Sequence, residues 1–166
     1  ELVASPGLAS GQGPDPARWR SSALATRIGT VFQEPEHQLV GRTVREEIAV
    51  GLRAIGLPAT SHASRVDPLL QRLRLDHLAD AHPFTLSGGE QRRLSVATVL
   101  ATGPRVIVLD EPTFGQDRRT WRELVALMAE LVADGAALLS VTHDADVVRV
   151  LGAGAASDRV VRLDAA

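Results

Sequence analysis

Residues 85–117, with the sequence TLSGGEQRRLSVATVLATGPRVIVLDEPTFGQD, decide the fold of this chain. The apolar pattern predicts a helix over Gly88–Leu100. Four apolar residues, Val106–Leu109, stand between Pro104 and Asp110, and this profile is typical of a strand covered on both faces. A helix that leads into a buried strand indicates an α/β fold.

Buried strands and helices alternate along the rest of the chain, which predicts a layered α/β core with a mostly parallel sheet. The other predicted elements are strands over 27–33 and 136–141, helices over 44–55, 65–79 and 120–133, and an edge strand over 157–163. The first 22 residues are rich in Gly, Pro, Ala and Ser, so we expect them to be mostly loop.

Two helix signals lie between residues 43 and 80, which we interpret as a small all-helical insertion. Thr43 and Glu46 have the spacing of a capping box, in which the Thr hydroxyl accepts a backbone N–H and the Glu reaches back. Pro68 lies early enough in the second helix to occupy its first turn.

Size and composition indicate one globular domain with its own core. The chain has 166 residues, 45% hydrophobic, and a formal charge of -2. Its 18 basic residues are all arginines scattered among 20 acids, so we expect no nucleic-acid partner. The absence of cysteine removes disulfides and thiolate metal sites. Neither a membrane-spanning stretch nor a signal-peptide pattern is visible in the sequence.

Polar groups directly follow the predicted parallel strands: Gln33, the pair Asp110 and Glu111, and His143. Open α/β sheets bind ligands at this edge. Taken singly, each group is more often structural than functional, because acidic pairs cap turns and helices while His and Gln are commonly solvated. Their joint placement favours a site.

These residue types suit phosphoryl transfer, which depends mainly on positioning and charge neutralisation. Asp110 offers a hard oxygen ligand for Mg²⁺, and Glu111 offers a carboxylate that can polarise an attacking water. His143 can contact a terminal phosphate oxygen, and Gln33 can complete the metal shell.

A second candidate binding feature is the turn at the start of a predicted helix, formed by Ser87, Gly88 and Gly89. Ser87 is a good N-cap, and the two glycines let the backbone approach an anion at the positive end of the helix. An ordinary Ser-capped helix with flexible glycines would explain this turn if it stood alone. Here it stands in one chain with the strand-end groups.

Five motifs, in order, resemble those of the ATP-binding cassette (ABC) ATPases. TLSGGEQRR resembles their signature motif, VIVLDEP their Walker B strand with the catalytic Glu, FGQD their D-loop and SVTHD their switch histidine. VFQEPEHQLVGRTVREEIAVGL resembles the Q-loop segment of the energy-coupling-factor branch, which drives uptake of vitamins and of cobalt or nickel ions. The match covers nearly everything from Arg27 to Val161.

The resemblance implies a P-loop NTPase-type (ABC ATPase) fold with an all-helical subdomain, and ATP and Mg²⁺ as cofactors. It also implies a head-to-tail dimer. Ser87, Gly88 and Gly89 would bind the γ-phosphate held by the other subunit, Gln91 would belong to the same nucleotide-binding set, and Asp117 would act across the dimer.

The remaining roles implied by the resemblance fall on the strand ends. Asp110 would hold Mg²⁺ and Glu111 would be the general base. Gln33 would touch the metal and the nucleophilic water, and His143 would steady the γ-phosphate.

The resemblance also divides the chain and implies its partners. Residues 1–40 would be a partial catalytic core up to the Q-loop, 41–86 the helical subdomain, and 87–166 the signature helix and the remainder of the core. The helical subdomain and Q-loop would receive a transmembrane coupling protein at the cytoplasmic face of the membrane. The second ATPase subunit would form a homo- or heterodimer with this chain.

The chain departs from the family in one large respect, because it contains no lysine and no GxxxxGK[ST] pattern. We interpret it as a cassette truncated before its N-terminal P-loop strand and helix, and expect it to be inactive alone. We also expect the apolar surface of the 106–109 strand and its neighbours to lack cover.

Two hypotheses of function stay open at this point. The first is the ATP-hydrolysing subunit of an importer; the second is a non-catalytic or split cassette, an interaction module that completes a nucleotide site on a partner subunit. The missing P-loop favours the second, whereas the retention of Glu111 and His143 opposes it. An ABC-type ATPase acting on DNA or the ribosome is disfavoured, since the chain lacks a long coiled-coil insertion or basic linker.

Overall fold

The computed structural model describes residues 3–34, 38–152 and 159–161. Its α-helices are α1 (Pro6–Ala9), α2 (Ser21–Ala25), α3 (Val44–Ala54), α4 (His62–Arg72), α5 (Gly88–Ala101), α6 (Arg118–Ala133) and α7 (Ala145–Leu151). The 3-10 helices are η1 (Pro16–Arg18), η3 (Ala59–Ser61), η4 (Asp76–Leu78) and η5 (Pro83–Thr85), and the strands are β1 (Ile28–Val31), β2 (Val106–Asp110) and β3 (Ala137–Val141). The edge strand expected over 157–163 falls largely outside the described residues.

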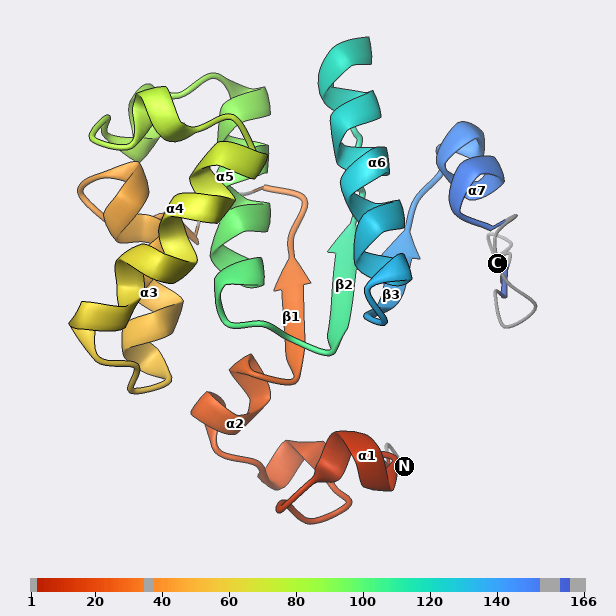
Figure 1. Cartoon of the computed structure of the whole chain (residues 1–166). Helices are drawn as coiled ribbons and strands as arrows, with labels where there is room; N and C mark the ends of the chain where they lie inside the picture. The colour runs from red at the N-terminus through yellow and green to blue at the C-terminus, as the bar shows by residue number, and fades with distance from the viewer. Residues whose placement is uncertain (1–2, 35–37, 153–158, 162–166) are drawn as a thin grey trace.

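The three strands form one parallel sheet in the order β1-β2-β3. Val31 pairs with Leu109, and Asp110 pairs with Val141. Figure 1 shows the three arrows pointing in the same direction, toward the end of the molecule where α5 and α6 begin. Parallel neighbours need long crossover connections, here made by helices, and the predicted α/β fold with a parallel sheet is confirmed.

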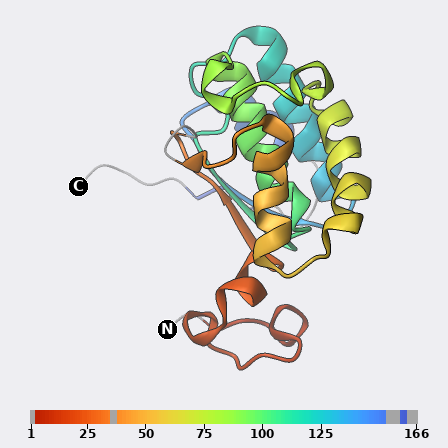
Figure 2. The ribbon, with the colours of Figure 1, turned by 90° about the vertical axis from the view of Figure 1, so that its left-hand side faces the viewer.

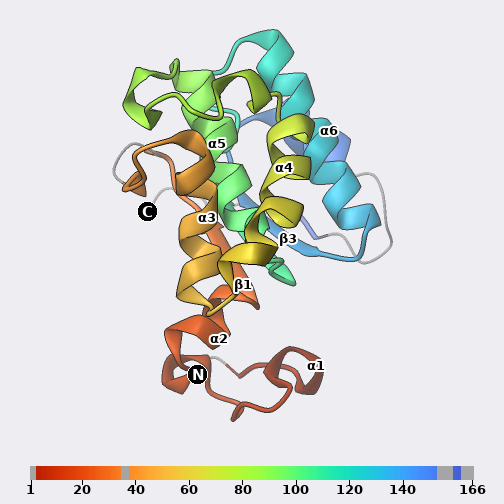
Figure 3. The same cartoon turned by 60° about the vertical axis from the view of Figure 1, so that its left-hand side comes forward.

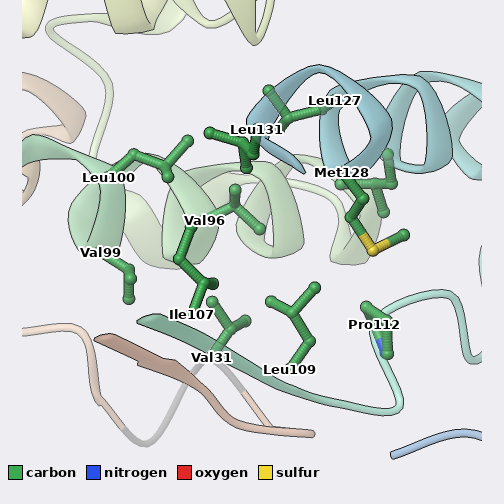
Figure 4. A pocket seen from close by; sticks show the side chains of 11 residues that line it. Val31, Val96, Val99, Leu100, Ile107, Leu109, Pro112, Leu127, Met128 and Leu131 are labelled. Atoms are coloured by element: carbon green, nitrogen blue, oxygen red, sulfur yellow. The ribbon is translucent and has the colours of Figure 1, made fainter. Parts of the chain in front are cut away.

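One face of the sheet packs under helices. Val31, Ile107 and Leu109 are 0%, 2% and 3% exposed, and Figure 4 shows them beneath side chains of α5 and α6. The apolar pocket between these layers has a volume of about 10 Å³, the space of a single water molecule. It is therefore a packing gap in the core, too small for a ligand.

The opposite face of the sheet carries apolar side chains with little cover. Leu139 and Val141 of β3 are 58% and 51% exposed, and Val106 and Val108 of β2 are half-buried. In Figure 2 the helices lie on one side of the sheet. The prediction that the 106–109 strand is covered on both faces, and that 136–141 is buried, is wrong for the described part of the chain. The expected uncovered apolar surface is confirmed.

Between residues 43 and 80, where an all-helical insertion was predicted, the structure has helices and no strand, and α3 and α4 lie beside α5 (Figure 3). The hydroxyl of Thr43 accepts a hydrogen bond from the N–H of Glu46 (3.1 Å), which caps α3. The carboxylate of Glu46 accepts from the N–H of Arg42 (3.1 Å) instead of Thr43. The reciprocal half of the predicted capping box is therefore wrong.

Helix α4 starts earlier than predicted. It begins at His62, whose Nε2 lies 2.9 Å from the carbonyl oxygen of Leu57. Pro68 consequently lies inside the helix, and its predicted place in the first turn is wrong. The Pro ring removes the N–H that would otherwise bond to the carbonyl of Ser64, so this turn of the helix is held by fewer hydrogen bonds.

Helix α4 also ends earlier than predicted, at Arg72 instead of near residue 79. Arg74 takes a left-handed conformation with φ 54°. This lets the N–H of Leu75 donate to the carbonyl of Leu70 (2.7 Å) and closes the helix in the way that glycine usually does.

The N-terminal segment has a small core of its own. Trp19 is 7% exposed, packs with Ala4 and Ala9, and donates from Nε1 to the carbonyl of Gly13 (2.7 Å). The guanidinium of Arg27 lies 5.4 Å from the Trp19 ring centroid. The expectation of mostly loop over the first 22 residues missed the short helices that this cluster organises.

None of the helices in the described ranges is long and apolar enough to cross a membrane.

Substitutions of Leu94 and Leu139 test whether only one face of the sheet is buried. Leu94 on α5 is 0% exposed, whereas Leu139 on the open face is 58% exposed. Leu94→Ala should lower the free energy of unfolding by about 2 to 5 kcal/mol, because it removes buried methyl groups and leaves a cavity. Leu139→Ala should cost less than about 1 kcal/mol. Urea unfolding measures both, and equal losses would contradict the burial described above.

Candidate functional site

Two of the sequence-predicted groups at the strand ends, Glu111 and His143, are in direct contact. Oε1 of Glu111 lies 2.8 Å from Nδ1 of His143 and accepts the backbone N–H of His143 (3.2 Å). Oε2 of Glu111 accepts from the hydroxyl of Thr142 (3.3 Å). Glu111 is thus held by the two residues that follow β3, and its side chain is only 18% exposed while that of His143 is 72% exposed.

The hydrogen bond that the His143 ring donates to Glu111 raises the pKa of His143, and the charge of Glu111 acts in the same direction. Burial opposes this rise and the neighbouring Asp144 charge supports it. The imidazole is therefore easier to protonate than an ordinary histidine, and the protonated ring forms an ion pair with the carboxylate.

The backbone of Glu111 is unusual, with φ 44° in a region that non-glycine residues rarely occupy. Its N–H still donates to the carbonyl of Val141 (2.9 Å), so the pairing with β3 continues one residue beyond β2. Such conformations persist where the surroundings hold them in place, often at functional sites.

Asp144, immediately after His143, is a residue that sequence reasoning missed. It accepts from Trp121 Nε1 (2.6 Å) and the Thr113 hydroxyl (3.1 Å), and it caps α7, a helix that was not predicted. These bonds, the one from Trp121 foremost, lower the pKa of Asp144. The Asp at the start of an apolar DADVVRV run was the available signal.

Gln33 reaches the same site through its backbone. Its carbonyl accepts from Nη2 of Arg92 (2.7 Å), and the same nitrogen lies 3.3 Å from the carbonyl oxygen of Glu111. The side chain of Gln33 is exposed. Arg92 was part of a recognised motif but received no role from the sequence, because a buried arginine has no signature in the apolar pattern.

Asp110 closes β2 and is half-buried. Within residues 3–34, 38–152 and 159–161 its carboxylate takes part in no hydrogen bond or ion pair, and no three acidic or histidine side chains cluster there as a metal site. Magnesium is commonly held by one or two protein oxygens together with phosphates and waters. A carboxylate without partners among the described residues fits that pattern.

The Ser87 turn opens α5, and its partner is Glu90. The N–H and the hydroxyl of Ser87 both donate to Oε2 of Glu90, at 2.8 and 2.7 Å, which lowers the pKa of that carboxyl. In the described part of the chain the N–H groups of Gly88 and Gly89 have no acceptor. They are available to an anion at the helix start.

The Ser87 turn also packs against the start of α6. A Cβ on Gly89 would lie 3.3 Å from Oε1 of Gln116 and 3.5 Å from the hydroxyl of Thr120, so the two segments lie in close contact. Gln91 donates from Nε2 to the carbonyl of Pro83 (3.3 Å), and its part in nucleotide binding stays a prediction.

Asp117 is the N-cap of α6. Its carboxylate accepts from the Thr120 hydroxyl (2.7 Å) and from the N–H groups of Arg119 (2.8 Å) and Thr120 (3.1 Å). These bonds, that of the Thr120 side chain first, lower the pKa of Asp117. Within the chain its oxygens serve its own helix, and its action across a dimer stays a prediction.

A buried carboxylate anchors the segment after Gln33. Glu47 on α3 is 2% exposed and accepts from the N–H groups of Val40 (2.8 Å) and Gly41 (2.5 Å). A Cβ on Gly41 would lie 2.6 Å from the Glu47 nitrogen, so only glycine permits this approach.

Comparison with known proteins finds one family over most of the chain, described as "ABC transporter" and matching residues 5–114. Among curated proteins, the chain is 45% identical over 131 residues to a putative HMP/thiamine import ATP-binding protein, YkoD, of Bacillus subtilis; the match covers 79% of this chain and 23% of the relative. It is 45% identical over 123 residues to the energy-coupling factor transporter ATP-binding protein EcfA2 of Symbiobacterium thermophilum, covering 74% of this chain and 43% of the relative.

Solved structures agree. The chain is 32% identical to cbiO1 from Clostridium perfringens, part of the ABC transporter complex cbiONQ, with a TM-score of 0.71 over 86% of this chain and 57% of the other. It is 28% identical to the dimeric ATP-binding cassette MJ0796 bound to ADP and Pi, with a TM-score of 0.69 over 80% and 61% of the two chains. The chain spans less than half the length of the two curated relatives above.

Replacing Glu111 by Gln should lower the pKa of His143, because the amide oxygen accepts a weaker hydrogen bond than the carboxylate and carries no charge to stabilise the imidazolium. In the unaltered chain the pair stabilises the fold fully below the ordinary histidine pKa of about 6.5, and that stabilisation disappears as pH rises through the raised folded value. An NMR titration of the His143 ring measures the shift. Glu123→Gln, which removes a carboxylate paired with Arg74 and Arg119, is the control and should leave His143 unchanged.

Glu47→Ala should lower the free energy of unfolding by about 2 to 4 kcal/mol, because two backbone N–H groups lose a charged acceptor in a buried place. Glu46→Ala, one residue away and exposed, should cost less than about 1 kcal/mol. Urea unfolding compares the two variants. A Glu47→Ala loss no larger than that of Glu46→Ala would show that the anchor contributes nothing.

Proposed function

The chain belongs to the ABC transporter family, and from this premise we propose that it is the ATP-binding and hydrolysing subunit of an energy-coupling-factor-like importer. The cargo would be a metal ion or a vitamin. The similarity to EcfA2, to cbiO1 and to the HMP/thiamine import protein supports this branch of the family.

The observation that carries the proposal is the meeting of Gln33, Glu111 and His143 at one end of the sheet. Glu111 contacts His143 directly, and the carbonyls of Gln33 and Glu111 share the guanidinium of Arg92. A carboxylate beside a basic imidazole can accept a proton from an attacking water, while the ring stabilises charge on a phosphate.

The cofactors of the proposed reaction are ATP and Mg²⁺. Asp110 would hold the metal, with the Gln33 amide oxygen as a further ligand, because both are hard oxygen donors for which residues 3–34, 38–152 and 159–161 supply no side-chain partner. The metal would neutralise phosphate charge. Glu111 would be the general base, and His143 would steady the γ-phosphate.

A second ATPase subunit, identical or different, would complete the nucleotide site. Ser87, Gly88 and Gly89 would face the nucleotide held by that subunit, through the helix-start N–H groups that have no acceptor in the described part of the chain. Gln91 and Asp117 would support the same contact. The dimeric cassette MJ0796 with ADP and Pi supports this arrangement.

The chain would work at the cytoplasmic face of the membrane as a peripheral subunit. Residues 41–86 would be the helical subdomain that receives a transmembrane coupling protein, with 1–40 and 87–166 contributing to the catalytic core. ATP binding and hydrolysis would then move the membrane partner by shifting the population of two arrangements of the dimer.

A second candidate is a split cassette that completes a nucleotide site on a partner without catalysing hydrolysis itself. The Ser87 turn favours it, since the N–H groups of Gly88 and Gly89 have no acceptor in the described part of the chain and are available to a nucleotide held elsewhere. In that case the Ser87 turn would act and Glu111 would be idle.

Steady-state ATP hydrolysis by the chain purified with its second ATPase subunit and membrane partner separates the two candidates. Glu111→Gln should lower turnover by about 100-fold or more if Glu111 is the general base. Glu123→Gln is the matched control and should retain turnover.

The opposite pattern would support the module instead. Turnover that is unaffected by Glu111→Gln but lost on Ser87→Arg, which blocks the helix start, would mean that this chain only completes its partner's site. A complex without ATP turnover would refute the proposed function.

A further inference from the structure

We propose that Arg92 is a positioning residue of this site: its guanidinium fixes the backbone that carries Gln33 and Glu111 to the helix that begins at the Ser87 turn. The inference rests on the proposed function, since it assigns to Arg92 an effect on ATP turnover. It extends that function to a residue buried beneath the site.

Arg92 is 3% exposed, an unusual place for a charged side chain. Its Nη1 donates to the carbonyl of Phe32 (2.5 Å), and its Nη2 donates to the carbonyls of Gln33 (2.7 Å) and Glu111 (3.3 Å). One side chain on α5 therefore joins the residues that follow β1 to those that follow β2.

These carbonyls lie where the strands have ended, so ladder pairing no longer fixes them. The backbone at Phe32 and Gln33 follows β1, and Glu111 has the strained φ of 44°. The hydrogen bonds to these carbonyls are partly buried, and the planar guanidinium supplies their donors in one rigid plane. Without the guanidinium, these carbonyls would lose their hydrogen-bond donors. The segments after β1 and β2 would then no longer be fixed relative to each other.

Arg92 also lies close to the start of α5, the part of the chain that is proposed to face the second subunit. It lies one helical turn after Gly88 and Gly89. If that turn faces the nucleotide of the second subunit, a displacement of α5 reaches Gln33 and Glu111 through a single buried side chain. Arg92 would then link the two nucleotide sites without contacting either nucleotide.

Lysine is the informative replacement, because it keeps the charge but places its donors on one nitrogen and cannot hold separate carbonyls in a plane. Arg53→Lys is the matched control. Arg53 also donates to a backbone carbonyl, that of Glu46 (3.3 Å), but it is exposed on α3.

The test measures ATP hydrolysis by the complete complex with both ATPase subunits and the membrane partner. Arg92→Lys should lower kcat about 100-fold, the effect of misplacing reacting groups by roughly 1 Å, while KM for ATP changes less than about threefold. Arg92→Gln, which keeps a donor but no charge, should behave in the same way and covers the case in which the lysine variant does not assemble. Arg53→Lys should match the unaltered complex.

Hydrogen exchange in the same complexes supplies a readout that does not depend on activity. With Arg92→Lys, exchange should accelerate at the N–H groups of residues 31–34, 110 and 111 and not across the whole chain. Unchanged exchange there, a general acceleration, or a kcat equal to that of Arg53→Lys would overturn the inference. If the unaltered complex hydrolyses ATP and the Arg92 variants match it, only this inference falls; an inactive unaltered complex removes the proposed function as well.

Discussion

Parallel pairing of β2 with both of its neighbours is the constraint on which the site depends. Val31 lies opposite Leu109, so Gln33 and Glu111, each two residues further on, leave the sheet at the same level. Asp110 lies opposite Val141, which brings His143 one residue past the level of Glu111. Neighbouring strands are about 4.8 Å apart, so side chains from adjacent strand ends can touch. The contact between Glu111 and His143 follows from this register.

The sequence predicted these strand ends because short apolar runs with polar residues directly after them are visible without a structure. It failed where backbone conformation decides the outcome. The left-handed Arg74 ends α4 with no glycine to signal it, and the left-handed Glu111 turns toward His143 although its residue type disfavours that conformation. Both conformations are enforced by neighbouring contacts that no local pattern encodes. Burial of Arg92 escaped prediction for the same reason, since its partners are carbonyls.

In this chain, which contains no lysine, two arginine side chains hold segments that lie outside regular secondary structure. Arg27 donates to the carbonyls of Leu8, Ser10 and Ala23 and thereby ties the N-terminal segment to β1. Arg92 joins two strand ends in the same manner. Both sites need a donor fork that serves several carbonyls in fixed directions, which an ammonium group cannot supply. At these two places, where regular secondary structure ends, arginine side chains therefore supply the donors that the backbone carbonyls need.

The pleat of β2 separates the two adjacent carboxylates of the site. Ile107 and Leu109 face the helices, whereas Val106, Val108 and Asp110 alternate onto the more open face. Glu111 lies beyond the strand and is bound by Thr142 and His143, while Asp110 has no such partner among the described residues. Neighbours in sequence are therefore in different surroundings: one carboxylate is oriented by hydrogen bonds and the other keeps its lone pairs for a ligand. In the proposed function this difference favours proton transfer by Glu111 and cation binding by Asp110, because no donor among the described residues competes with a metal for the oxygens of Asp110.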